Sequence, residues 1–493
     1  MYFLGIDLGS SSIKLSLLDG ESNKTLQDVT VPKHEMKIHA PKHGWAEQDP
    51  KQWWENVKQG VAELKNNTDV DFQLVKGIGI AYQMHGLVVV DKNLEPLRPS
   101  IIWCDSRAAE IGQQHYEAIG AETCQEQILG SPGNFTASKL KWVKENQPDV
   151  YAKIKYFMLP GDFIATKLTG VAQTSTSGLS EAALWNFKEN RLATEILDAM
   201  EISTELVPEV VPNFAEQAKV DPSIAAELGI SNQAIVSYRA GDQPNNAWSL
   251  NVSNPGEIAT TAGTSAVIYG LSSLDDYDKN NRINTFLHVN NQEDHKRNGV
   301  MVCINGSGIL YQWIRQLMSV DRDEPLNYET LNEFAKKSVP GSKGLRFYPF
   351  GNGVERIFNN KPAFSGVQNL NFNIHQTPEF VRAACEGIVF AMHYGFEIMR
   401  EVGVEGKVVR AGNSNLFLNP AFREIFIHTT NTSLELYDTS GSEGAARGAA
   451  YGLGYYKSVE ETFKGLVCIE RFDPDPELVQ KYKEIYQNWK NNI

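Results

Sequence analysis

The chain opens with Phe3-Leu4-Gly5-Ile6-Asp7-Leu8-Gly9-Ser10-Ser11-Ser12-Ile13-Lys14-Leu15-Ser16-Leu17-Leu18-Asp19-Gly20. An apolar run, a turn of small residues and a second apolar run that ends in Asp-Gly are typical of a β-hairpin. A related pattern returns about half a chain later, in Gly256-Glu257-Ile258-Ala259-Thr260-Thr261-Ala262-Gly263-Thr264-Ser265-Ala266-Val267-Ile268-Tyr269. Two such hairpins predict a duplicated fold with two similar halves.

Around these hairpins, segments with the pattern of strands alternate with amphipathic helical segments, which predicts the α/β class with mixed sheets. The chain of 493 residues is too long for one ordinary core. Turn-forming residues at 251–256 suggest a linker, so we expect two domains, residues 1–250 and 256–493. Helices are predicted from Pro50, with Asp49 as the N-cap, over residues 379–402 and 420–429, and in the tail, 474–493.

Composition limits the possible partners. The net charge of −14 argues against broad binding of nucleic acid or an anionic membrane, although local donors and a metal ion can still hold an anionic nucleotide in a cleft. The five cysteines are widely spaced and form no CxxC pair, as expected of reduced thiols in a cytoplasmic protein. No signal peptide is evident, and no apolar run approaches the roughly 18 residues of a membrane span.

The first hairpin turn offers a site for phosphate. Asp7 stands at a strand end and is followed by the turn amides and hydroxyls of Gly9, Ser10, Ser11 and Ser12 and by Lys14. Such a turn can bind an anion while the carboxylate holds a metal ion through water; an ordinary hairpin turn is the alternative. The second turn, Gly263-Thr264-Ser265, is of the same kind, and the two could grip a polyphosphate between domains. No GxxxxGK[ST] loop is present, which excludes P-loop chemistry.

Two further clusters suit a polar substrate. Gln83, Met84 and His85 follow an apolar strand at residues 77–81, so these side chains can project from its end. Trp103-Cys104-Asp105-Ser106-Arg107 combines an aromatic face with a carboxylate and a guanidinium, a mixture that binds sugars. Two alternatives stay open: a structural histidine at position 85, and a structural ion pair between Asp105 and Arg107.

Asp242 is the candidate general base. It stands in Arg239-Ala240-Gly241-Asp242-Gln243-Pro244, directly after the apolar segment 234–238. A strand that delivers a carboxylate to a turn is a common way to place a base over a cleft. The alternative is an Asp that caps the following helix. The phosphate turns and the sugar-like clusters favour the base.

Taken together, these motifs resemble the FGGY family of carbohydrate kinases, within the actin-like ATPase superfamily, over essentially the whole chain. The matching segments follow the order of the family: residues 7–14, residues 43–50 with Trp53-Trp54, residues 134–143, Gly241-Asp242-Gln243, Gly263-Thr264-Ser265 and residues 308–313. Within the family, residues 83–91 and 98–107 are similar to the xylulose kinases.

The resemblance implies two actin-like (ribonuclease H-like) ATPase domains with a cleft between them. It implies an ATP-dependent kinase for the terminal hydroxyl of a ketopentose, converting D-xylulose to D-xylulose 5-phosphate, with Asp242 as the base and Mg²⁺ near Asp7. It implies sugar contacts from Gln83, Met84, His85 and Gln243, supported by Trp103, Asp105 and Arg107. The implied nucleotide contacts are Gly9, Ser10, Ser11, Ser12, Lys14, Gly263, Thr264, Ser265, Gly308, Gln312, Gly412 and Asn413.

The resemblance also implies a homodimer. Two alternatives to a xylulose kinase remain. The substrate could be another ketose or polyol, such as ribulose, fuculose or erythritol. The chain could instead be an actin-like switch that hydrolyses ATP without a sugar, although such a switch would have no use for the cluster around Met84 and His85.

Overall fold

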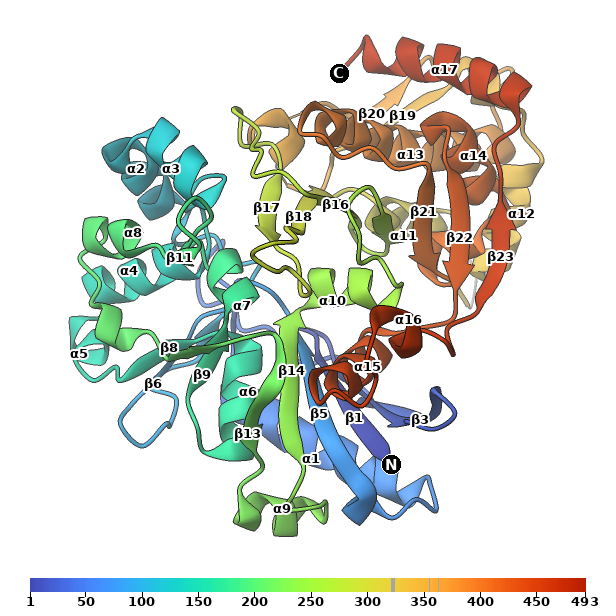
Figure 1. Ribbon diagram of the computed structural model, residues 1–493. Helices are drawn as coiled ribbons and strands as arrows, with labels where there is room; N and C mark the ends of the chain where they lie inside the picture. The colour runs from blue at the N-terminus through green and yellow to red at the C-terminus, as the bar shows by residue number, and fades with distance from the viewer. Residues whose placement is uncertain (321–323, 354, 362) are drawn as a thin grey trace. The chain divides into compact units, whose positions relative to one another are not determined.

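The computed structural model describes residues 1–320, 324–353, 355–361 and 363–493, and these residues form two compact units (Figure 1). Each unit is assembled from three segments, unlike the contiguous halves expected from the sequence. Unit 1 comprises Met1–Ser253, Phe286–Asn298 and Thr439–Leu466, and unit 2 comprises Asn254–Thr285, Gly299–Asp438 and Val467–Ile493. The first change of unit, between Ser253 and Asn254, falls inside the segment suggested as a linker.

Unit 1 is built on a six-stranded sheet in the order β13-β14-β5-β1-β2-β3. The predicted hairpin is present, with β1 antiparallel to β2, whereas β1, β5 and β14 run parallel to one another. The strands are β1 (Tyr2–Leu8), β2 (Ile13–Asp19), β3 (Lys24–Val31), β5 (Val75–Tyr82), β13 (Phe214–Lys219) and β14 (Ile235–Gly241).

One face of this sheet is covered by α1 (Pro50–Asn66). Asp49 caps the helix by accepting a hydrogen bond from the backbone N–H of Lys51. The predicted apolar face is buried, since Trp53, Val57 and Val61 are at most 1% exposed. Burying this face supplies the apolar contact that a lone amphipathic helix lacks.

The opposite side of the sheet carries α15 (Gly441–Gly452), from late in the chain (Figure 1). The helix lies directly on the strands because Gly5 of β1 and Gly79 of β5 are register neighbours without side chains. A Cβ atom at Gly5 would lie 1.8 Å from the carbonyl oxygen of Ser442, and one at Gly79 would lie 1.9 Å from that of Ala445. Glycine is therefore required at both positions.

The remaining elements of unit 1 include short sheets and a group of helices between β5 and β14. The helices are α2 (Ala109–Ile119), α3 (Ala121–Ile128), α4 (Thr136–Asn146), α5 (Pro148–Tyr151), α6 (Pro160–Thr169), α7 (Thr176–Glu181), α8 (Thr194–Ala199), α9 (Pro222–Leu228), then α10 (Asp242–Ser249) and α16 (Val459–Thr462). The short strands are β4 (Glu47–Gln48), β6 (Val88–Val90), β7 (Ser100–Ile101), β8 (Tyr156–Met158), β9 (Gln173–Ser175), β10 (Trp185–Asn186), β11 (Arg191–Leu192) and β12 (Glu209–Val211).

Unit 2 is built on a seven-stranded sheet in the order β17-β18-β16-β15-β21-β22-β23. The second predicted hairpin is confirmed by the antiparallel pair β15 and β16, and helices occupy each of the three predicted regions of this half. The strands are β15 (Ile258–Ala262), β16 (Ala266–Ser272), β17 (Asn284–Leu287), β18 (Asn298–Ile304), β21 (Val408–Gly412), β22 (Ser433–Tyr437) and β23 (Cys468–Phe472), with β19 (Arg346–Pro349) and β20 (Ser365–Gln368) pairing separately. The helices are α11 (Gly308–Leu317), α12 (Tyr328–Lys336), α13 (Thr377–Glu401), α14 (Pro420–Thr430) and α17 (Pro476–Lys490).

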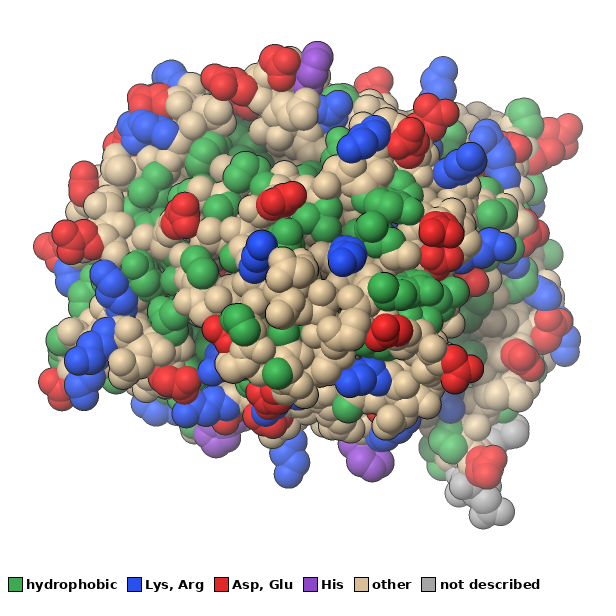
Figure 2. Space-filling model, turned by 60° about the horizontal axis from the view of Figure 1, so that its bottom comes forward, with side chains coloured by type: hydrophobic (Ala, Val, Ile, Leu, Met, Phe, Trp, Pro, Cys, Tyr) green, Lys and Arg blue, Asp and Glu red, His purple; other side chains and the backbone are tan. Residues whose placement is uncertain are grey.

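Basic and acidic side chains are interspersed on the face of the molecule that Figure 2 shows. Among the described residues, no helix has both the length and the apolarity to cross a membrane.

Candidate active site

The polar residues singled out in the first half of the sequence meet at one edge of the unit 1 sheet. Leu8 and Gly241 are both register partners of Tyr82. Because parallel neighbours end at the same edge, the residues at and after these strand ends are brought side by side. They include Asp7 at the end of β1, Gln83 after β5 and Asp242 after β14.

Asp242 is the first residue of α10 rather than part of a turn. The N-cap is Gly241, and no side chain makes a capping hydrogen bond there, so the carboxylate does not serve as the helix cap. Asp242 is half-buried. Burial and the charge of Asp7 together raise the pKa of its carboxyl to about 7, against hydrogen bonds from Gln243 that lower it. A carboxylate with such a pKa can hold a proton near neutral pH.

Glu181 lies beside this carboxylate, and no sequence motif pointed to it. It ends α7 and is 1% exposed. Burial raises the pKa of Glu181 well above its usual value, and the nearby Asp242 adds to the shift. A Cβ atom at Gly241 would lie 2.3 Å from Glu181 Oε2, so the glycine before Asp242 makes room for it.

Met84 and His85 lie next to Gly241 and Glu181, beside Asp242. Met84 Cγ would lie 2.6 Å from a Cβ at Gly241. His85 has a backbone φ of 60°, a conformation that is sparsely populated outside glycine and clusters at functional sites. Its Nδ1 lies 2.9 Å from the carbonyl oxygen of Glu181, and its ring packs against Phe135 and Phe286, with centroids 4.5 and 5.4 Å away. The imidazole is thus held firmly in one orientation.

Lys139 of α4 holds the backbone of His85 in place through a hydrogen bond. Its side chain is fully buried and donates hydrogen bonds to the carbonyl oxygens of His85, at 2.8 Å, and Ile102, at 3.1 Å. Burial lowers the pKa of this lysine to about 7. The lysine thereby fixes the unusual backbone at His85. It falls in the segment 134–143, which the sequence matched to the family without assigning this residue a role.

Gln83 connects the sugar-like cluster to the first phosphate turn. It is 2% exposed, and its Nε2 donates to Gln48 Oε1 at 3.1 Å. Gln48 in turn donates to the carbonyl oxygen of Ser10 at 2.7 Å. The amide of Gln48, from the segment 43–50, therefore fixes the turn relative to the end of β5.

Asp105 and Arg107 form a buried ion pair, with Arg107 Nη2 2.7 Å from Asp105 Oδ2. Arg107 also contacts Glu47 at 2.7 Å, and Glu47 contacts Arg98 at 2.5 Å. The guanidinium lies 3.7 Å from the centroid of the Trp45 ring. These contacts match the structural alternative for the pair. Trp103, in contrast, is 49% exposed.

The first phosphate turn closes through a hydrogen bond from Gly9 N–H to the carbonyl oxygen of Ser12, at 3.0 Å. Asp7 and Lys14 are direct partners across the hairpin. Burial raises the pKa of Asp7, and the positive charge of Lys14 opposes that shift. A cation beside Asp7 would offset the same cost of burial.

The surroundings of Asp7 suit a Mg²⁺ ion bound partly through water. Gly441 admits the carboxylate, since a Cβ atom there would lie 2.3 Å from Asp7 Oδ2. Asn245 is fully buried and donates to the carbonyl oxygen of Gly441 at 2.8 Å, while its Oδ1 has no hydrogen-bond partner among the described residues. Across those residues no three His, Cys, Asp or Glu side chains gather into a metal site.

In unit 2, a cavity of about 360 Å³ lies beside the second hairpin turn. Gly263, Thr264, Gly308 and Gln312 line it, together with Tyr328 and the amides of Asn332 and Asn415. Gly308 N–H donates to the carbonyl oxygen of Gly263 at 2.8 Å. Ser265, Gly412 and Asn413 do not line the cavity, although the structure describes all three. Gly412 ends β21, three residues before Asn415.

The sequence matches two family models in succession: the N-terminal domain of the FGGY family of carbohydrate kinases over residues 2–247, and the C-terminal domain over residues 258–455. The chain belongs to the FGGY family of carbohydrate kinases. The resemblance inferred from the motifs is thereby confirmed. Membership makes the chain a carbohydrate kinase, an enzyme that transfers a phosphoryl group from ATP to an alcohol group.

Individual relatives agree over nearly the full length. The chain is 28% identical to a xylulose kinase of Staphylococcus epidermidis, covering 98% of this chain and 95% of the relative. It is 26% identical to a xylulose kinase of Bacillus subtilis, covering 99% and 96%. The crystal structure of a xylulose kinase from Rhodospirillum rubrum is similar to this FGGY kinase with a TM-score of 0.89 at 20% identity, covering 100% and 98%. The predicted α/β fold with two actin-like domains is thus confirmed.

Proposed function

We propose that this FGGY kinase is a xylulose kinase, which transfers the γ-phosphoryl group of ATP to the terminal hydroxyl of D-xylulose and yields D-xylulose 5-phosphate and ADP. The relatives named xylulose kinase, which align with nearly the whole chain, support the choice of sugar. The observation that carries the chemistry is Asp242, a carboxylate at the start of α10 that is not used as a cap and has a pKa raised to about 7.

Asp242 accepts the proton of the terminal hydroxyl as that oxygen forms a bond to the γ-phosphorus. The bond between this phosphorus and the bridging oxygen breaks, and ADP keeps its electron pair. A base with a pKa near the working pH is suited to this transfer, because a substantial fraction of it is ionised before the reaction and it is still basic enough to take the proton.

The sugar is bound at the ends of β5 and β14. Met84 offers an apolar wall beside Gly241, and His85, held by Glu181 and Lys139, presents its ring at a fixed angle. The carboxyl of Glu181 and the amides of Gln83 and Gln243 supply polar groups for the hydroxyls. The buried ion pair of Asp105 and Arg107 stabilises this arrangement without contacting the sugar.

Mg²⁺, when bound near Asp7 and Asn245, offsets negative charge on the phosphate oxygens. The turn at Gly9–Ser12 with Lys14 offers donors for phosphates in unit 1. In unit 2 the cavity beside Gly263, Thr264, Gly308 and Gln312 has the size and the amide-rich lining that suit the nucleoside. The five widely spaced cysteines support a cytoplasmic enzyme, and the family resemblance supports a homodimer.

A panel of sugars tests this function. Purified protein is given ATP, Mg²⁺ and, in turn, D-xylulose, D-ribulose, L-fuculose and erythritol, and ADP release is followed. We expect the highest kcat/KM with D-xylulose. A clear preference for another member of the panel would overturn the choice of sugar, and ATP turnover indifferent to every sugar would instead favour the nucleotide switch.

The base assignment is tested with Asp242→Asn. We expect this variant to keep its fold and its affinity for ATP while kcat falls by about 10²–10⁴-fold, the usual contribution of a positioned base. Asp198→Asn is the matched control, because Asp198 is exposed on α8. Near-normal turnover in Asp242→Asn would sink the assignment.

A further inference from the structure

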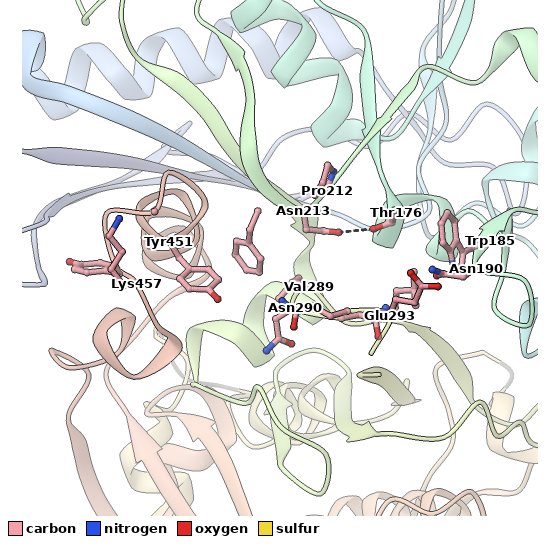
Figure 3. Close-up of a pocket in the computed structure, with 16 residues that line it drawn as sticks. Thr176, Trp185, Asn190, Pro212, Asn213, Val289, Asn290, Glu293, Tyr451 and Lys457 are labelled. Atoms are coloured by element: carbon pink, nitrogen blue, oxygen red, sulfur yellow. Dashed lines mark hydrogen bonds between the residues drawn. The ribbon is translucent and has the colours of Figure 1, made fainter. Parts of the chain in front are cut away.

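Unit 1 contains a second cavity, of about 540 Å³ (Figure 3). Its walls come from five parts of the unit: the start of α7, the segment around β10 and β11, the start of β13, the segment Phe286–Asn298 and the segment Thr439–Leu466. None of the residues assigned above to sugar, nucleotide or metal lines it. The volume lies within the range of small-molecule sites.

Aromatic side chains form two sides of this cavity. Figure 3 shows Tyr451 on one side and Trp185 on the other. Phe214 also lines it and is held between rings, with its centroid 4.9 Å from that of Tyr451 and 4.8 Å from that of Trp248. These contacts fix the aromatic surface in advance, so a ligand would not have to order it.

Side-chain amides occupy the space between the rings. Asn213 is anchored by a bond from its Nδ2 to the carbonyl oxygen of Arg239, at 2.8 Å, and by a bond from Thr176 Oγ1 to its Oδ1, at 3.3 Å. Asn290 donates to the carbonyl oxygen of Ser253 at 3.0 Å. Its Oδ1 and the Nε1 of Trp185 are buried polar atoms without a hydrogen-bond partner in the described part of the chain. Asn190 and Gln292 add exposed amides at the opening.

The charges at the opening balance. Lys457 and Glu293, both exposed, are the two charged residues of the lining, and they stand at different sides of the cavity (Figure 3). A polyanion such as a nucleotide would face a single cation and a carboxylate here, which disfavours it. Aromatic faces combined with neutral amides match a ligand that has apolar C–H faces and a rim of hydroxyls.

We propose that this cavity binds a neutral carbohydrate of one or two rings, at a site separate from the catalytic one. The ring faces of the sugar rest on Trp185, Phe214 and Tyr451, and its hydroxyls exchange hydrogen bonds with the exposed amides of Asn190 and Gln292. This inference does not rest on the identity of the phosphorylated sugar.

Two elements connect this site to the catalytic one. The six-residue α7 begins with Thr176 in the cavity and ends with Glu181 beside Asp242. Phe286 contacts the His85 ring, and the next residue, Leu287, lines the cavity and donates its N–H to Ser180 Oγ at 3.0 Å. Occupancy of the cavity therefore alters the dissociation constant of the sugar substrate at the catalytic site, and that substrate alters the dissociation constant of the cavity ligand by the same factor.

The test is hydrogen–deuterium exchange of the full chain with D-xylose, D-xylulose and maltose as probes, each raised to the millimolar range. We expect at least one probe to protect residues 185–193 and 451–457, which lie away from Asp242 in the sequence and line the cavity. Gln292→Trp places a large ring at the opening without removing any side-chain hydrogen bond of the wild type. The probe concentration needed for this protection should rise about tenfold, which corresponds to a loss of 1.4 kcal/mol of binding free energy.

Asn66→Trp, an exposed substitution at the end of α1, is the matched control and should leave protection unchanged. His85→Ala should also leave protection of these two segments in place, because His85 is not among the residues that line the cavity. The proposal fails if no probe protects the two segments, if Gln292→Trp protects like the wild type, or if His85→Ala abolishes the effect, which would then have come from the catalytic site.

Discussion

At Asp242, the raised pKa that suits the reaction lowers the stability of the fold. The pKa of its carboxyl is raised from 3.8 to about 7, so between these values the folded chain binds more protons than the unfolded chain. The contribution of this residue to the free energy of unfolding therefore falls as the pH rises through that window. Asp7, on β1 of the same sheet, adds to the cost because the two carboxylates repel each other.

This sign predicts that Asp242→Asn stabilises the protein in alkaline solution. In a buffer with a chelator and without ATP, we expect the Tm of the variant to exceed that of the wild type at pH 8 and the difference to shrink toward pH 4. Scanning calorimetry at the two pH values measures it. A variant less stable than the wild type at pH 8 would contradict the strained state of this carboxylate.

The same carboxyl predicts the acid limb of the rate profile. Protonated Asp242 cannot accept a proton, so kcat/KM for the sugar should fall about tenfold for each pH unit below about 7. Initial rates between pH 5 and 8 at saturating MgATP measure this limb. Asp198→Asn should reproduce it, and a flat profile down to pH 5 would argue against Asp242 as the base.

Lys139 is a positioning residue whose effect should appear in sugar binding. Lys139→Met removes the hydrogen bonds to the carbonyl oxygens of His85 and Ile102 and leaves both acceptors buried. We expect the KM for the sugar to rise about tenfold, the equivalent of 1.4 kcal/mol, while the KM for ATP stays near its wild-type value.

Steady-state kinetics with each substrate varied in turn separates the two KM values. Lys141→Met is the matched control, because Lys141 lies on the same helix and its partners are Glu145 and Glu201. His85→Ala should show the same selectivity for the sugar as Lys139→Met. Equal effects on both substrates would mean that Lys139 supports the fold of unit 1 in general.

Among the contacts between elements, the contact of α15 with the sheet is the one that least tolerates an added side-chain atom. Gly79→Ala places a methyl group where the carbonyl oxygen of Ala445 stands 1.9 Å away, so helix and strand must separate. We expect a loss of about 1–3 kcal/mol or more in the free energy of unfolding. Denaturant titration with a constant m-value would measure it.

Gly170→Ala controls for the loss of a glycine as such. Gly170 has a φ of 72° and no atom within 4 Å of the added Cβ, so its cost is the strain of left-handed backbone, about 1 kcal/mol. If Gly79→Ala costs no more than Gly170→Ala, the close approach of α15 is not what requires glycine on β5.

For the whole molecule, residues 439–466 belong to unit 1 although most of that unit comes from the first half of the chain. Truncation late in the chain should therefore destabilise unit 1. A chain that ends at Asp438 loses α15 and should show non-cooperative unfolding and bind a hydrophobic dye. A chain that ends at Lys490 should unfold like the full chain. Cooperative unfolding of the shorter chain, monitored by circular dichroism, would contradict the dependence of unit 1 on α15.

Local patterns predicted much of this architecture. The alternation around Asp7 and around Thr264 was enough for both hairpins, because a strand–turn–strand unit is specified by neighbouring residues. The parallel register that places Asp242 beside Asp7 joins segments more than 200 residues apart, and the sequence suggested their proximity through the family resemblance alone. Glu181 and Lys139 were not assigned roles because a single Glu or Lys acquires its importance from burial. Neither was α15 foreseen, since small residues carry no amphipathic stripe.

The late position of α15 has a consequence for how the protein is made. Ser253 leaves the ribosome about 200 residues before Leu466, an interval of roughly 10 to 40 s at the usual 5–20 residues per second. During that time the glycine-bearing face of the nascent sheet has no helix to cover it, and the catalytic edge cannot be completed near Gly441. Unit 1 therefore cannot finish folding until Leu466 has been synthesised. A chaperone that binds nascent chains would act on unit 1 mainly in that interval.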